Sequence, residues 1–207
     1  MADSSTPAKL SVKSGTKTNA RRAEILESAA KLFYQKGYHV TTIEDVARDV
    51  GMLKGSLYYH IKSKEEMLFE LVHEGIQAAK TTVQARLLGV SGPVRELEVA
   101  FEGHMDHIIR QQVRVGLLLH EFDSLPRDRQ QQVRDLMRTY QNLFVAIIRR
   151  GQQQGVFIPG DPNLLVNGIL GMGNWIYRWY RPGFGSPPEV VKKSFLQMIM
   201  SGIQPRG

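Results

Sequence analysis

Apolar residues recur at helical spacing along most of the chain, and no segment shows the alternating pattern of a β-strand. The first part of the chain has four such segments. We expect the first from about Arg21 to the break at Gly37, and the second from Thr42 to Gly51. The third covers 54–60, and the fourth runs from about 63 toward 87. A hydroxyl residue followed three positions later by Glu, the capping box of a helix start, occurs at 41–44 and again at 63–66.

Glycine and proline divide the rest of the pattern into further helices, at about 93–111, 113–123, 127–153, 162–181 and 187–203. The break at 89–93 (GVSGP) is the clearest seam between an N-terminal module and the remainder. The sequence therefore predicts an all-α protein of about nine helices.

Composition and charge narrow the possible classes of protein. No apolar run reaches the roughly 18 to 20 residues of a membrane-spanning helix, and no signal peptide precedes the first helix, so we expect a cytoplasmic protein without a membrane partner. There is no cysteine, which removes disulfides and thiolate ligands. Residues 1–64 carry eleven Lys and Arg against six Asp and Glu, an excess that favours polyanions. Within this region, residues 1–20 have the composition of a disordered basic arm.

The segment 42–61 (TIEDVARDVGMLKGSLYYHI) has the features of a helix-turn-helix. Ala47 is small enough for two short helices to meet, and Gly51 permits a turn with positive φ. The second helix then displays Lys54, Ser56 and neighbouring aromatic residues, which suit phosphates and base edges in a major groove.

Residues 20–68 closely resemble the DNA-binding domain of the TetR family, including the Gly37-Tyr38 break, the double Thr, the Gly51 turn and the Ser63-Lys64 helix start. The resemblance implies a three-helix DNA-binding domain over 21–68 and a helical ligand-binding and dimerisation domain over 69–205. It also implies a set of DNA-contacting residues: Thr42, Lys54, Gly55, Ser56, Tyr58, Tyr59, His60 and Lys64. Of these, Thr42, His60 and Lys64 occupy phosphate-facing positions of the family, whereas Tyr58 fits either a DNA contact or a packed position between the helices. The sequence departs from the family at Leu53, where a small hydroxyl residue often caps the recognition helix.

The resemblance further implies a transcriptional repressor, not an enzyme. Such a protein binds a palindromic DNA operator as a homodimer, is released by a small-molecule effector, and needs no cofactor. The helices near 162–181 and 187–203 carry enough apolar residues to pack inward and against a second copy. A regulator without a small-molecule sensor, acting architecturally or as an activator, stays open as an alternative. A helical enzyme is disfavoured because no catalytic constellation occurs.

The segment 171–182 (GMGNWIYRWYRP) contains both tryptophans of the chain. These aromatic residues fit either plain core packing or a ligand site in which arginines hold an anionic group. The segment resembles that of TetR-type regulators responding to acyl-coenzyme A thioesters. That resemblance implies an acyl-CoA effector, with Asn174, Trp175, Arg178 and Trp179 near its head group and its acyl tail among Leu118, Phe122, Phe144 and Ile148. A sensor of an uncharged hydrophobic ligand is the other possibility.

Histidines at 104, 107 and 120 raise the question of a metal site. Metal binding would require them to converge with Asp106 or Glu121, whereas helix histidines are more often partly exposed and structural. We therefore expect no metal site.

Overall fold

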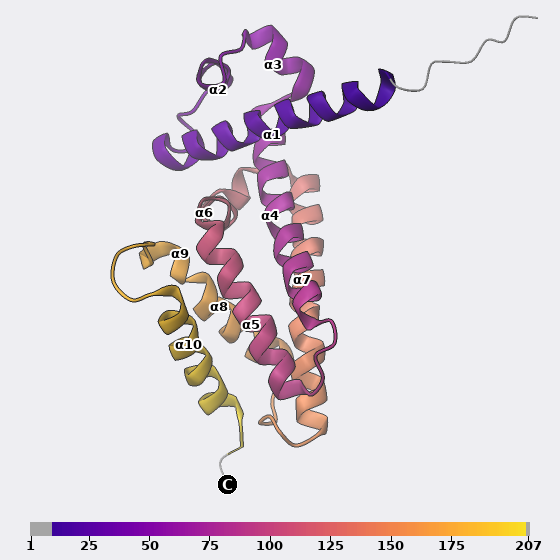
Figure 1. Ribbon diagram of the computed structural model, residues 1–207, viewed down its shortest axis with the longest axis vertical. Helices are drawn as coiled ribbons and strands as arrows, with labels where there is room; N and C mark the ends of the chain where they lie inside the picture. Colours follow the sequence, from indigo (N-terminus) through magenta and orange to yellow (C-terminus); the bar gives the residue numbers. More distant parts are fainter. Residues whose placement is uncertain (1–9, 206–207) are drawn as a thin grey trace, which may run out of the picture. The chain divides into compact units, whose positions relative to one another are not determined.

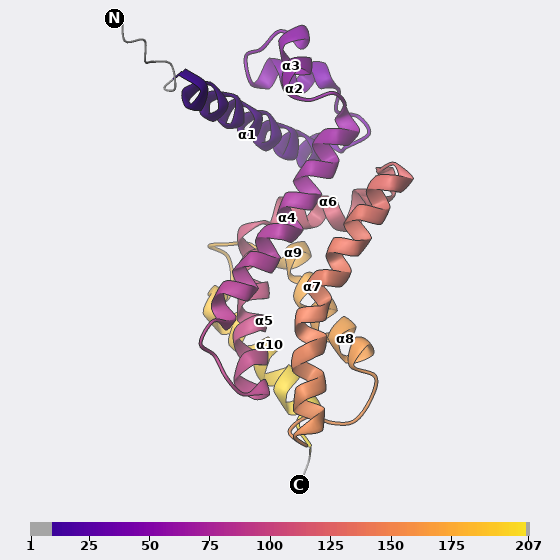
Figure 2. The same cartoon turned by 90° about the vertical axis from the view of Figure 1, so that its right-hand side faces the viewer.

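The computed structural model describes the backbone of residues 10–205 and the side chains of residues 18–205. The chain divides into two compact units, residues 1–71 and 72–207, and helix α4 (Lys64–Leu87) contributes to both. Figures 1 and 2 show that each unit is built of helices. The described residues contain no β-strand beyond an isolated bridge between Arg181 and Phe184.

The first unit consists of α1 (Leu10–Lys36), α2 (Ile43–Asp49), α3 (Lys54–His60) and the start of α4. Its core gathers the apolar face of α1 and the inner faces of the short helices, all nearly inaccessible to solvent: Ile25, Ala29, Phe33, Val46, Ala47, Leu57, Ile61 and Met67. Burial of such a cluster is what holds two helices as short as α2 and α3 in place, because helices of this length are marginal alone.

The second unit contains the rest of α4 and the helices that follow: α5 (Pro93–Arg110), α6 (Gln112–Glu121), α7 (Arg127–Gln153), α8 (Pro162–Asn174), α9 (Ile176–Trp179) and α10 (Pro188–Ile203). A short 3-10 turn, η1 (Phe122–Ser124), joins α6 to α7. Helix α5 lies at the centre and packs against α7, α8 and α10 (Figures 1 and 2). Consistent with this position, α5 buries residues on nearly every side.

A group of charged side chains ties three helices of the second unit together. Asp106 of α5 accepts hydrogen bonds from Arg86 of α4 and from Lys192 of α10, the latter at 2.8 Å. Only 17% of the Asp106 side chain and 12% of the Lys192 side chain are exposed. Burial disfavours the charged carboxylate, but the hydrogen bond and attraction from Lys192, together with Arg86 and Arg110, lower the pKa of Asp106 overall.

The all-α prediction is confirmed, and most helix bounds agree with it within two residues. Two differ. Helix α1 begins at Leu10, whereas the sequence predicted a start near Arg21 and an arm over 1–20; residues 1–9 of that arm lie outside the described residues. Extending a helix that has already nucleated requires only one residue to be fixed per hydrogen bond, so a polar stretch can continue it. The helix expected over 162–181 is divided at Trp175 into α8 and α9, although Trp175 itself keeps helical φ and ψ.

Candidate DNA-binding surface and ligand pocket

The turn before α2 sets the start of the helix-turn-helix. Thr42 is the N-cap of α2, accepting a hydrogen bond from the Asp45 amide at 3.1 Å, while its own amide donates to the Asp45 carboxylate at 3.0 Å. The capping box thus lies one residue later than the Thr41–Glu44 pattern suggested. The Thr41 hydroxyl is instead buried and donates to the carbonyl of Gly37 at 2.8 Å.

Helix α3 presents an open surface. Tyr59 is 82% exposed, and Lys54, Gly55 and Ser56 are exposed at its first turn. Leu53 stands at the N-cap position without a side-chain hydrogen bond, as the sequence indicated. The first amide groups of α3 therefore lack a side-chain acceptor.

Two of the predicted DNA-contact side chains at α3, Lys54 and Tyr58, have partners within the protein. Lys54 forms an ion pair with Glu44 of α2; this hydrogen bond raises the pKa of Lys54 and lowers that of Glu44, so both are charged. The Lys54 ammonium also lies 6.0 Å from the centre of the Tyr58 ring, which is half exposed. His60 is half-buried, and its carbonyl accepts a hydrogen bond from Arg22.

Two adjacent arginines of α1 donate hydrogen bonds to the carbonyl groups at the ends of α2 and α3. Arg21 donates to the carbonyl of Val50 at the end of α2, at 2.8 Å. Arg22 donates to the last residue of α3 and forms ion pairs with Glu66 and Glu70 of α4. Unpaired carbonyls at the ends of helices are stabilised by cations, so these contacts hold α2 and α3 in register.

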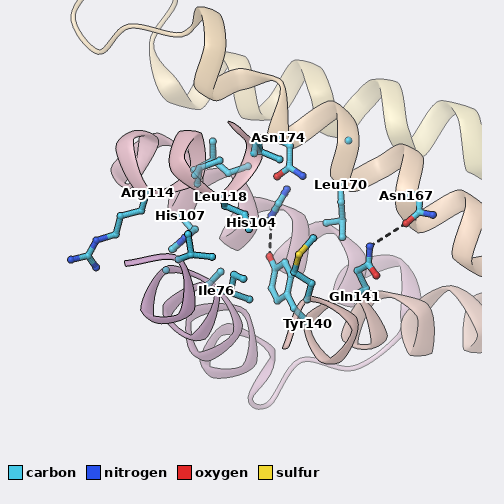
Figure 3. Close-up of a pocket in the computed structure, with 18 residues that line it drawn as sticks. Ile76, His104, His107, Arg114, Leu118, Tyr140, Gln141, Asn167, Leu170 and Asn174 are labelled. Carbon is cyan, nitrogen blue, oxygen red and sulfur yellow. Dashed lines mark hydrogen bonds between the residues drawn. The ribbon is translucent and has the colours of Figure 1, made fainter. Parts of the chain in front are cut away.

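The second unit contains a pocket between α4, α5, α6, α7 and α8 (Figure 3). It holds about 830 Å³ of space free of protein atoms, part of it open to solvent. Most of its wall is apolar, and the polar residues that line it come from different helices: His104, His107, Arg114, Tyr140, Gln141, Asn167 and Asn174. A mainly apolar cavity with a few convergent polar groups is the usual form of a small-molecule site.

Burial keeps both pocket histidines neutral. It lowers the pKa of His104 to about 4, with a smaller contribution from His107. It also lowers the pKa of His107 to about 4, assisted by repulsion from Arg110 and Arg114. His104 Nδ1 and the Tyr140 hydroxyl form a buried hydrogen bond of 2.9 Å (Figure 3), and burial raises the pKa of Tyr140. The pocket thus offers uncharged hydrogen-bonding groups beside the single cation Arg114, which pairs with Glu74 at 3.9 Å.

The structure separates the predicted ligand residues into three groups. Leu118 and Asn174 both line the pocket. Phe144 and Ile148 are fully buried in the core and do not line it, and Phe122 lies in η1 beneath the guanidinium of Arg134. The predicted head-group residues that follow the pocket-lining Asn174 in the chain do not line the pocket and are exposed: Trp175 by 61% and Trp179 by 45%, with Arg178 between them in the sequence also exposed.

Several pocket residues were not assigned to a ligand from the sequence. His104 and His107 were noticed as a helical pair, but the sequence could not show that both face a cavity. Tyr140, Gln141 and Asn167 come from α7 and α8, and only the packing of these helices brings them together. Glycines inside predicted helices, Gly75 and Gly171, were the available signal of space for a ligand.

Neither a metal site nor a membrane span is found within the described residues. Between residues 18 and 205, no group of three His, Cys, Asp or Glu side chains is arranged to hold a metal ion. His104 instead pairs with Tyr140, and His120 pairs with Tyr177. Over the same part of the chain, no helix is both long and apolar enough to cross a bilayer.

Comparison with known proteins identifies the family. Residues 25–71 match the bacterial regulatory proteins of the tetR family, and residues 91–203 match the tetracyclin repressor-like C-terminal domain. The chain belongs to the TetR family. It is therefore a transcriptional regulator with a helix-turn-helix DNA-binding domain.

Individual relatives are similar over nearly the whole chain. The transcriptional repressor KstR2 of Mycobacterium tuberculosis is 29% identical over 91% of this chain and 96% of its own. Its structure, described as a ketosteroid transcriptional regulator, superposes with a TM-score of 0.82, covering 91% of this chain and 97% of that one. The TetR-family regulator PfmR from Thermus thermophilus is 32% identical, with a TM-score of 0.80 and coverage of 87% and 99%. AibR, solved with isovaleryl coenzyme A and operator DNA, is 28% identical, with a TM-score of 0.79 and coverage of 86% and 97%.

Proposed function

We propose that this TetR-family protein is a repressor that binds a palindromic operator as a homodimer and is released by an acyl-CoA thioester. The observation that carries the proposal is the pocket of the second unit, whose lining includes Asn174, the residue that precedes the exposed Trp175 in the chain. A mainly apolar cavity suits an acyl chain, whereas the exposed indole of Trp175 and the exposed guanidinium of Arg178, which follow Asn174 in the chain, suit the adenine and phosphates of coenzyme A. The complex of AibR with isovaleryl coenzyme A and operator DNA supports the same class of effector.

The proposed DNA contacts are those on the exposed side of the helix-turn-helix. Tyr59 and the first turn of α3 would enter the major groove, and Thr42 at the start of α2 would meet a phosphate. Lys54 would exchange its ion pair with Glu44 for a contact to DNA. No reorganisation of the core is needed, because Leu57 already fills the interior side of α3.

The proposed homodimer uses α8 and α10. Large apolar side chains on these helices are exposed to solvent: Leu164 by 69%, Val190 by 51% and Met198 by 54%. An apolar surface of this kind on two neighbouring helices is suited to a two-fold four-helix interface. Such a dimer places two recognition helices about one DNA turn apart, which is why the operator is expected to be palindromic.

Release by the effector requires a coupling between the pocket and the DNA-binding helices. Helix α4 is continuous from Lys64 to Leu87 and lines the pocket with Val72, Gly75, Ile76 and Ala79. In the proposed mechanism, ligand shifts α5, α4 transmits the shift, and the spacing of the recognition helices widens. A coupling free energy of about 1 to 3 kcal/mol would weaken DNA binding about 5- to 150-fold.

A thermal-shift screen against coenzyme A and a panel of acyl-CoA thioesters tests the effector. Ligand at about 100 times its dissociation constant adds roughly 2.7 kcal/mol, which for a chain of this size raises the melting temperature by about 5 to 10 °C. We expect Arg178→Ala to reduce the shift and Arg138→Ala, which removes an exposed arginine of α7, to leave it unchanged. A shift only with uncharged hydrophobic compounds would replace the thioester by that class. No shift with any compound would favour a regulator without a small-molecule sensor.

A further inference from the structure

Lysine residues at the junction between α3 and α4 differ in what their ammonium groups contact. Lys64, the first residue of α4, directs its ammonium at three backbone carbonyls of the turn after α1. The distances are 2.8 Å to Tyr38, 3.1 Å to Thr41 and 3.3 Å to His39. The same ammonium lies 4.3 Å from the centre of the Tyr38 ring.

These contacts use the full donor capacity of Lys64. A lysine ammonium has three N–H donors and no acceptor, so three carbonyls satisfy it. A DNA phosphate could be bound only by giving up one of them. The carbonyl of Thr41 directly precedes Thr42, the N-cap of α2, so these bonds fix the turn from which α2 begins.

Nearly all other cations of the first unit are engaged within the protein as well. Among residues 18–71 these cations, each with an anionic or carbonyl partner, are Arg21, Arg22, Lys31, Lys36, Arg48 and Lys54. Within that range, Lys62 is the cation whose side chain has neither an ion pair nor a hydrogen bond. Lys62 is exposed, and its backbone amide donates to the Glu66 carboxylate at 2.7 Å.

Lys62 therefore has an ammonium group that is available to bind DNA, and it lies close to the recognition helix in the chain. It follows the last residue of α3 by two positions and precedes α4 by two, and Tyr59, the most exposed aromatic residue of α3, is three residues before it. The Glu66 hydrogen bond holds its backbone, whereas its ammonium keeps its full charge for an external anion. A duplex docked on α3 passes its phosphates along the flanks of the recognition helix, where a cation contributes affinity without sequence preference.

We propose that Lys62 is the phosphate-contacting lysine at this junction, and that Lys64 is a positioning residue that acts through the turn at 37–41. The proposal rests on the DNA binding proposed above. It reverses the role that the family resemblance implies for Lys64, because in this chain the ammonium of Lys64 is already satisfied.

The salt dependence of DNA affinity separates the two roles. Each phosphate neutralised contributes about 0.9 to the slope of log K against log of the salt concentration. We expect Lys62→Met to flatten the slope by about 0.9 per bound subunit and to leave the melting temperature unchanged. The matched variant Lys64→Met should lower the melting temperature. It should also lower log K for DNA binding by the same amount at every salt concentration, so that the slope is unchanged.

The experiment uses full-length protein and a duplex recovered from a randomised library with the wild-type chain. Amide hydrogen exchange supplies a further readout: exchange over residues 37–42 should accelerate in Lys64→Met and not in Lys62→Met. An unchanged slope in Lys62→Met overturns the proposal, even if Lys64→Met does not fold, and so does a flattened slope in Lys64→Met. Failure of the wild-type chain to bind any duplex would instead contradict the proposed function.

Discussion

Replacing Gly173 with alanine perturbs the contact between α8 and the pocket histidine of α5. A Cβ atom at Gly173 would lie 2.7 Å from both Cδ2 and Nε2 of His104, and 3.4 Å from Cε2 of Phe101. Non-bonded heavy atoms pack at about 3.5 to 4.0 Å, so the imidazole or the helix must move by roughly 1 Å. His104 is fully buried and hydrogen-bonded to Tyr140, so it cannot swing into solvent to make room.

The magnitude follows from two opposing effects. Overpacking a core costs about 1 to 3 kcal/mol, whereas replacing glycine by alanine inside a helix gains up to about 1 kcal/mol. Gly171 supplies the matched control. It lies in the same helix, and a Cβ there meets nothing within 4 Å, so Gly171→Ala has the gain without the clash.

Thermal unfolding of the two variants without ligand measures the difference. At about 2 to 4 °C per kcal/mol for a chain of this length, Gly173→Ala should melt about 2 to 12 °C below Gly171→Ala. Equal melting temperatures would show that the His104 ring does not lie against Gly173. That result would contradict the close packing of α5 on α8 at this wall of the pocket.

Three further predictions concern the DNA surface, the histidines and the buried ion pair. Tyr59→Ala should weaken specific DNA binding while leaving the melting temperature unchanged, since the side chain is 82% exposed; a gel-shift titration and a melting curve measure both. Because the pKa of His104 and of His107 in the folded protein is about 4, below the usual 6.5, the unfolded chain binds more protons between these values. The free energy of unfolding should therefore be independent of these groups above pH 6.5 and fall as pH drops from about 6.5 to 4; denaturant titrations showing no fall in this window would contradict their burial. Asp106→Asn should lower the free energy of unfolding by about 1 to 3 kcal/mol, since Lys192, 12% exposed, would lose one of its two carboxylate partners and keep only Glu189; an unchanged denaturation midpoint would mean that the Asp106–Lys192 pair contributes nothing.

The two halves of the protein differ in how far their sites can be predicted from sequence. In the helix-turn-helix, the decisive residues are neighbours in the chain. Gly51 adopts a positive φ of 63° at the turn, and Leu53 leaves α3 without a side-chain cap, as the sequence indicated. Such local features follow from backbone conformation and short-range hydrogen bonds, so a single sequence can reveal them.

The role of Lys64 shows the limit of this approach even in a familiar segment. Its three carbonyl partners lie 23 to 26 residues earlier in the chain. No pattern around Lys64 distinguishes an ammonium held by a turn from one available to DNA. The same holds for Arg22, whose partners are at the end of α3 and in α4.

The sequence by itself determined the all-α class, most helix bounds and the exposed recognition helix, because amphipathic periodicity and capping are properties of short segments. Only the tertiary structure decided which side chains meet in the second unit. His104 and Tyr140 are 36 positions apart and share a buried hydrogen bond, while Phe144, one turn beyond Tyr140, is in the core and not at the cavity. An apolar side chain on an inward helix face has the same periodicity whether it fills the core or lines a pocket. The difference depends on how closely neighbouring helices approach, and at Gly173 that approach is set by a single missing Cβ.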